Sequence, residues 1–202
     1  MIRVVVFDLG QVLASPPGLY REPARLLGVD PAAFEAGYWA DRRAYDTGGA
    51  VADYWSPLLT GLGVPPTGAL VDRLDALDAA MWVDVRAGAL AVVDAVRGWG
   101  VATALLSNAP LSLGAAVRRT GWVDRFDDVF ISAELGMTKP DPRVFAEVTG
   151  RLGVAPAEVA FVDDRQPNVA AAERFGWHAH LWVDDADTMA WVTAACSPAA
   201  LA

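Results

Sequence analysis

The chain has 202 residues, enough for one folded core or for a core that carries a smaller inserted unit. A hydrophobic content of 54% favours extensive burial, but no apolar run approaches the roughly 18 residues of a membrane span. The net charge of −9 disfavours nucleic acid and anionic membranes as partners. Cys196 is the only cysteine, so no intramolecular disulfide can form, and we expect a cytoplasmic protein.

Short β-branched runs alternate with amphipathic helical stretches along the chain. In chain order, the sequence predicts a strand at 2–7, a helix at 89–99, a strand at 101–106, a helix at 111–119, a strand at 129–131, a helix at 142–152, a strand at 159–162, a helix at 167–175 and a strand at 179–183. This alternation is typical of a Rossmann-like α/β fold, a parallel sheet with helices on both faces.

One segment interrupts the alternation. Residues 17–83 show helical patterning and no convincing strand, so we predict an inserted helical cap there. The remaining residues, 1–16 and 84–202, then form the α/β core domain. The last six residues, SPAALA, are expected to fray.

Four predicted strands end in polar residues or lead into them. In chain order these residues are Asp8, then Ser107 and Asn108, then Lys139 in the loop GMTKPDP, then Asp163 and Asp164. Ligands of open α/β sheets bind beyond the carboxyl ends of the strands. We therefore expect these side chains to meet at one rim of the sheet.

The charges at this rim indicate a chemistry. Three carboxylates, Asp8, Asp163 and Asp164, repel one another unless a cation lies between them, and Mg²⁺ suits a site of carboxylates, waters and a phosphate oxygen. Lys139 adds positive charge, and the Ser107 hydroxyl can donate to a phosphoryl oxygen. A carboxylate in line with such a group can attack it and form an aspartyl phosphate. Taken singly, Asp8, Ser107 with Asn108, and Lys139 are better explained as a cap, a turn and a solvated side chain. The adjacent carboxylates of Asp163 and Asp164 fit such an explanation least, because they are costly after a buried strand unless a cation or caps use them. The order of all these residues on alternating strands favours the site.

The sequence resembles the haloacid dehalogenase superfamily over essentially its whole length. FDLGQVL, LLSN, GMTKPDPRVF and FVDDRQPNVAAAERFG look like the four motifs of that superfamily, in order, and the inserted helices look like its type 1 cap. Within the superfamily, the motifs are similar to those of bacterial sugar-phosphate phosphatases, including enzymes that act on glucose 1-phosphate. The resemblance implies a hydrolase of a small phosphorylated metabolite with Mg²⁺ as cofactor. It does not indicate an oligomeric state.

The resemblance also implies roles for individual residues. Asp8 matches the nucleophile and a metal ligand, and Gly10 would offer its backbone carbonyl to the metal. Ser107, Asn108 and Lys139 would bind the phosphate, and Lys139 would also neutralise the nucleophile. Asp163 and Asp164 match the acidic metal-binding positions. Asn168 stands where many members carry a further aspartate. Apart from the resemblance, Arg42, Arg43 and Asp46 could reach the substrate from the cap, although arginines in such a cap are more often solvated.

Position 10 departs from the family pattern. Most phosphatases of the superfamily carry there a second aspartate as general acid and base, and glycine cannot transfer a proton. Loss of a general acid typically costs about 10²–10⁴ in rate. Two alternatives to a phosphatase stay open. One is a carbon–halogen hydrolase that uses the same aspartate attack without metal, against which the Asp163–Asp164 pair argues because uncompensated carboxylates would repel a leaving halide. The other is a phosphate-binding regulatory protein without turnover, which the glycine at position 10 favours. A mutase is disfavoured because it needs the missing acid and base.

Overall fold

A computed structural model describes residues 1–196, and the SPAALA tail expected to fray lies outside the described residues. Five parallel strands form one sheet in the order β3-β2-β1-β4-β5. The strands are β1 (Val4–Phe7), β2 (Ala102–Ser107), β3 (Asp128–Ile131), β4 (Val159–Asp163) and β5 (His178–Leu181). The strand order reverses at β1, so β1 lies in the middle of the sheet, where ligands of this architecture bind.

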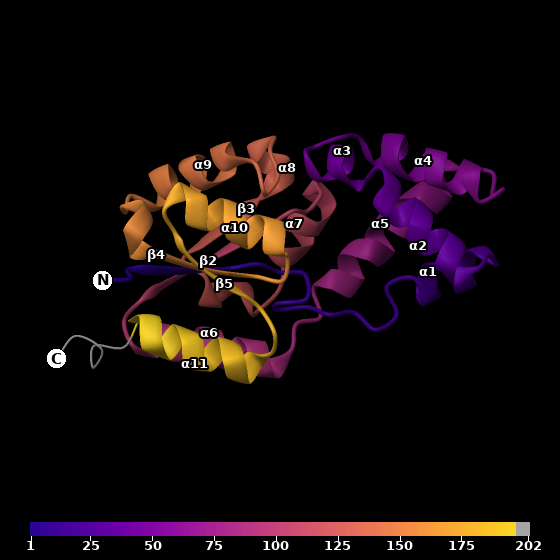
Figure 1. The fold of residues 1–202 in the computed structure, drawn as a ribbon. Coiled ribbons are helices and arrows are strands. Elements are labelled where there is room, and N and C mark those ends of the chain that lie inside the picture. Colours follow the sequence, from indigo (N-terminus) through magenta and orange to yellow (C-terminus); the bar gives the residue numbers. More distant parts are fainter. Residues whose placement is uncertain (197–202) are drawn as a thin grey trace.

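Helices cover both faces of the sheet (Figure 1). The core helices are α6 (Ala87–Gly98), α7 (Leu111–Val117), α8 (Ser132–Leu135), α9 (Pro142–Leu152), α10 (Gln166–Phe175) and α11 (Asp185–Cys196), with short 3₁₀ turns at Val123–Arg125 and Pro156–Glu158. Because side chains alternate along a strand, Val4 and Val6 pack in the apolar cluster under α9 and α10, whereas Val5 and Phe7 pack in the cluster that includes α6 and α11. The central strand is therefore buried on both faces, as expected for a parallel sheet.

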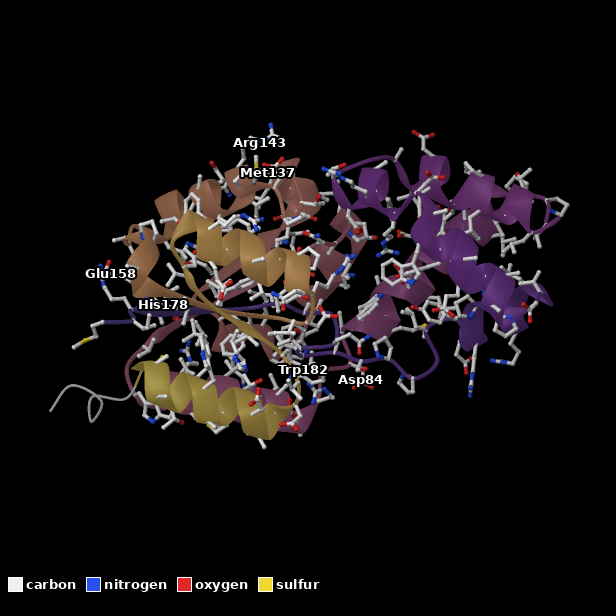
Figure 2. The ribbon with its side chains drawn as sticks, in the orientation of Figure 1. Asp84, Met137, Arg143, Glu158, His178 and Trp182 are labelled. Carbon is white, nitrogen blue, oxygen red and sulfur yellow. The ribbon has the colours of Figure 1, made fainter. Side chains whose placement is uncertain are left out.

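Five helices lie between β1 and α6 in the chain. They are α1 (Arg21–Leu27), α2 (Pro31–Ala40), α3 (Arg42–Asp46), α4 (Val51–Gly61) and α5 (Gly68–Trp82). They form a separate layer beyond one end of the sheet (Figure 1). Figure 2 labels Asp84, in the link from α5 back to the sheet, near this end, and Glu158 and His178 at the opposite end. The carboxyl ends of the strands therefore face the helical layer. Within residues 1–196, no helix combines the length and apolar character needed to cross a bilayer.

The α/β fold class predicted from the sequence is confirmed. The elements differ in detail: the strand predicted at 179–183 is β5 at His178–Leu181, and the helix predicted at 111–119 ends at Val117. Helix α11 was not predicted. Its buried positions are Thr188, Val192 and Cys196, spaced four residues apart, and two of these three are not strongly apolar, so the pattern was weak.

Candidate active site

The pairing of β1 with its neighbours brings distant residues together. Phe7 pairs with Val162, so Asp8 and Asp163, the next residue of each strand, lie side by side at the rim. Ser107 ends β2 on the other side of β1. A cavity of about 570 Å³ opens at this rim, and its core wall includes Asp8, Gly10, Ser107, Asn108, Lys139 and Asp164. Of the residues predicted to form the site, only Asp163 does not line the cavity, because it lies fully buried behind it.

Lys139 is buried at the centre of this group. Its Nζ donates hydrogen bonds to Asp8 Oδ1 at 2.8 Å, to Asp163 Oδ2 at 2.7 Å and to the Leu106 carbonyl at 2.8 Å. An ammonium group has three N–H donors, so these contacts engage all of them. Lys139 thus offsets part of the charge of two carboxylates at once and fixes the orientation of Asp8.

Asn108 holds the backbone that carries Lys139. Its Nδ2 donates to the Lys139 carbonyl at 2.9 Å, and its Oδ1 accepts the Lys139 backbone N–H at 2.9 Å. Both ends of the Asn108 amide are thereby engaged. Although Asn108 lines the cavity, its contacts are those of a positioning residue.

Asp163 is held from several sides. Its Oδ1 accepts the Arg165 backbone N–H at 2.9 Å, and Asn168 Nδ2 donates to both carboxylate oxygens, at 2.9 and 3.0 Å. With the Lys139 contact, most of the lone-pair positions of this carboxylate are used. Asn168 can donate here, which an ionised aspartate could not do.

The negative charge at the rim exceeds what Lys139 neutralises. Burial and the nearby charges of Asp163 and Asp164 raise the pKa of Asp8 to about 7, against the opposing effect of Lys139. Burial and the Asp163 charge likewise raise the pKa of Asp164. Carboxylate oxygens of the three aspartates lie within 4.8 Å of one another. A hard divalent cation would fit these oxygen donors and relieve their repulsion.

The chain turns sharply after Asp8. The Gly10 carbonyl accepts the Val12 N–H at 2.6 Å, and Gln11 has a left-handed φ of +59°. Arg86, which directly precedes α6, donates from Nη2 to the Gln11 carbonyl at 3.3 Å and to the Val12 carbonyl at 2.5 Å. A carbonyl oxygen has two lone pairs, so that of Gly10 can still accept a second partner from the cavity.

The helical layer supplies the other wall of the cavity. The residues concerned are Tyr38, Trp39, Arg42, Arg43, Asp46 and Trp82. Arg42, Arg43 and Asp46 had been considered from the sequence as residues that could reach a substrate. Tyr38, Trp39 and Trp82 had not, and neither had Arg165 on the core side. Aromatic residues are frequent throughout this layer, so nothing in the sequence distinguished these three from the aromatics that only pack.

Arg42 is buried rather than solvated. Its Nε donates to Asp46 Oδ1 at 3.0 Å and its Nη1 to Asp78 Oδ2 at 3.0 Å. The guanidinium also lies over the Tyr38 ring, 4.6 Å from its centroid. Arg42 is therefore fixed as part of the cavity wall, whereas its neighbour Arg43 is exposed.

Curated relatives include enzymes of two kinds. The chain is 37% identical over 82 residues to a sesquiterpene phosphatase of Aspergillus oryzae, a match that covers 40% of this chain and 42% of the relative. It is 30% identical over 136 residues to (S)-2-haloacid dehalogenase 1 of a Pseudomonas species, which covers 64% of this chain and 60% of the relative. The matched segments thus span less than two thirds of these relatives.

Solved structures share the fold. An enzyme of the haloacid dehalogenase family from Bacteroides thetaiotaomicron, in complex with magnesium and inorganic phosphate, superposes with a TM-score of 0.72 at 22% identity, over 90% of this chain and 94% of that one. The model of the haloacid dehalogenase-like hydrolase family matches residues 2–176. Since this match takes in most of the chain, including every predicted site residue, the chain belongs to the haloacid dehalogenase-like hydrolases.

Proposed function

We propose that this hydrolase is a magnesium-dependent phosphatase of small phosphomonoesters, with Asp8 as nucleophile. The observation that carries the proposal is the buried Asp8–Lys139–Asp163 arrangement, with Asp164 beside it in the same cavity. Lys139 binds Oδ1 of Asp8, which leaves Oδ2 available for attack. Lys139 lowers the negative charge at the rim, and Mg²⁺ would supply the further positive charge that an acidic protein needs in order to receive a phosphate.

The reaction follows from these positions. Asp8 Oδ2 forms a bond to phosphorus while the bond from phosphorus to the ester oxygen breaks. The ester oxygen departs as an anion with the bonding electron pair and takes a proton from water. Ser107 donates its hydroxyl to a phosphoryl oxygen, and Lys139 offsets the charge of the Asp8 carboxylate. Water then attacks the aspartyl phosphate, which releases inorganic phosphate and restores Asp8.

The residues at the rim divide into those that would bind the metal and those that hold these residues in place. Asp8, Asp164 and the Gly10 carbonyl would hold Mg²⁺, and the ion would supply charge that neutralises the phosphoryl oxygens. Asp163 was predicted from the sequence as a ligand. Its oxygens receive Lys139, Asn168 and Arg165, so we assign it mainly to positioning these groups.

The helical layer is proposed as the part that selects the substrate. In this proposal residues 17–83 form a cap over a core of residues 1–16 and 84–202. The cavity volume suits a small phosphorylated metabolite such as a sugar phosphate. The phosphatase relative and the fold shared with a phosphate-bound enzyme support this substrate class. The cytoplasm is the proposed place of action, because a single cysteine requires no oxidising compartment.

Hydrolysis of a carbon–halogen bond is the second candidate. Two observations favour it: a haloacid dehalogenase is among the relatives, and a halide leaves without the proton that Gly10 cannot give. Against it, Asp163 and Asp164 would repel a departing halide unless a cation lies among the carboxylates. The buried ammonium of Lys139 is already shared between Asp8 and Asp163.

A single assay separates the two candidates. The purified protein is offered a panel of phosphomonoesters and of 2-haloacids, each with Mg²⁺ and with EDTA. A phosphatase releases phosphate with Mg²⁺ and loses this activity in EDTA. Halide release that is unaffected by EDTA, together with no phosphate release, would establish the dehalogenase instead.

A further inference from the structure

Gly10 faces an aromatic side chain of the helical layer. A Cβ placed on Gly10 would lie 3.6 Å from Cζ3 and 3.8 Å from Cη2 of Trp82, and 3.9 Å from Oδ2 of Asp8. These are ordinary van der Waals distances, so one methyl group fits there. A longer side chain directed into this space would have to pass between the edge of the indole and the Asp8 carboxylate.

Trp82 is fixed in this place. It is the last residue of α5 and is only 7% exposed. Its Nε1 donates to the Tyr38 hydroxyl at 3.1 Å, and that hydroxyl donates to Asp78 Oδ1 at 2.7 Å. Asp78 is in turn paired with Arg42. This chain of hydrogen bonds sets the orientation of the indole, which presents the edge of its six-membered ring to Gly10.

The two residues therefore act as a pair. A side chain at position 10 would begin in van der Waals contact with Trp82, so its atoms beyond Cβ would have to turn away from the indole or displace it. The cavity next to Asp8 thereby has an apolar wall where a proton donor would otherwise stand. The loop after β1 therefore provides no acid at position 10, and the helical layer places an indole next to that position.

We propose that Trp82 determines specificity for the leaving group. Resting on the proposed phosphatase function, the inference is that this enzyme acts on phosphate esters whose leaving group needs no proton in the transition state and packs against the indole. Phenolic, anomeric and acyl phosphates belong to this class. Their oxygen departs as an anion with the electrons of the broken bond to phosphorus and takes a proton from water afterwards.

The difference between leaving groups is large enough to measure. A phenol ionises near pH 10, as the tyrosine side chain does, whereas water ionises only near 15.7 and simple alcohols behave like water. Without a donor, an alkoxide must leave unprotonated. General acid catalysis is worth about 10²–10⁴ in rate. The rate of hydrolysis of alkyl phosphates should therefore be lower than that of phenyl phosphates by more than a difference in substrate binding would explain.

A double-mutant cycle tests the pairing. The wild type, Gly10→Asp, Trp82→Val and Gly10→Asp/Trp82→Val are assayed on a series of aryl and alkyl phosphates. Gly10→Ala is the matched control for position 10, because its methyl group fits without a carboxyl. Trp82→Phe is the matched control for position 82, since it keeps an aromatic ring but removes the Nε1 donor. The kcat/KM of each protein is plotted against the pKa of the leaving group.

We expect a steep plot for the wild type and for Gly10→Ala. Gly10→Asp alone should stay steep, whereas the double variant should raise kcat/KM for alkyl phosphates at least about 10²-fold over Trp82→Val. If Gly10→Asp alone flattens the plot as much as the double variant does, Trp82 does not exclude the carboxyl. A flat wild-type plot would also overturn the inference, because another residue would then donate the proton.

A second readout does not depend on turnover. Residues in contact give non-additive effects on the free energy of unfolding. Gly10→Asp should destabilise the protein less in the Trp82→Val background than in the wild type, as measured by urea denaturation. Additive effects would contradict the contact. No phosphate release from any ester, with a clear stability coupling, would instead overturn the proposed function and keep the steric pairing.

Discussion

Asp8 is the residue on which the proposed chemistry depends most. Asp8→Asn keeps nearly the same shape but replaces the attacking oxygen with a poor nucleophile. We expect phosphate release to fall by at least about 10³-fold, because covalent catalysis has no substitute group at this position. The measurement is kcat of the purified variant, with circular dichroism to show that the fold is intact. A folded variant with activity within a few-fold of the wild type would remove Asp8 from its role.

The proposed metal site predicts different effects of substitutions at Asp164 and at Asn168. A ligand that binds the folded state raises the free energy of unfolding, by about 2.7 kcal/mol at a hundred times its Kd. Mg²⁺ should therefore raise the thermal midpoint of the wild type. Asp164→Ala should lose this response more completely than Asn168→Ala, because Asn168 acts only through Asp163. Equal responses of both variants and the wild type would count against the site.

Among the elements, α3 and α5 are joined by one buried cation between two carboxylates. Arg42 lies between Asp46 on α3 and Asp78 on α5, and all three are almost fully buried. Removing one partner of such a group leaves charge without compensation. Arg42→Met should therefore lower the free energy of unfolding by about 3–5 kcal/mol.

The exposed neighbour Arg43 is the matched control for this substitution. Arg43→Met removes the same charge from the same helix and should change the free energy of unfolding by no more than about 0.5 kcal/mol. Urea denaturation of both variants is the measurement. Equal effects would mean that the buried network contributes nothing beyond overall charge.

The same network should make stability depend on pH. Burial outweighs the attraction of Arg42 and raises the pKa of Asp46 from 3.8 to about 6. Between these values the folded state keeps a proton that the unfolded state has released, so the free energy of unfolding falls as pH rises from about 4 to about 6. Asp46→Asn should make this decline smaller, and the part that remains is expected from Asp8, whose pKa is also raised. A decline of the same size in Asp46→Asn would assign it to other groups.

For the whole molecule, the sheet and its rim could be predicted because local patterns determine them. β-Branched runs ending in Asp8, Ser107 and Asp163 showed both the strands and the edge at which they meet. The partners of these residues were harder to predict. That Asn108 binds the Lys139 backbone, or that Asn168 donates to Asp163, depends on loop conformations that strand patterns do not encode.

The wall contributed by the helical layer could not be predicted in detail. Trp82 lies 72 positions after Gly10 in the sequence, and only the packing of α5 over the rim brings them together. The sequence did show that an acid was missing at position 10. What fills its space depends on tertiary structure, which composition and periodicity do not report.

The most direct test of the account is to trap the intermediate on Asp8. The protein is mixed with Mg²⁺ and an aryl phosphate, quenched in acid within one turnover and digested for mass spectrometry. Phosphoryl transfer through Asp8 predicts one added phosphoryl group on the peptide that contains Asp8, absent from Asp8→Asn. If this peptide stays unmodified while a 2-haloacid, in a parallel reaction, leaves its acyl chain esterified to Asp8, the protein is a dehalogenase and the account is contradicted.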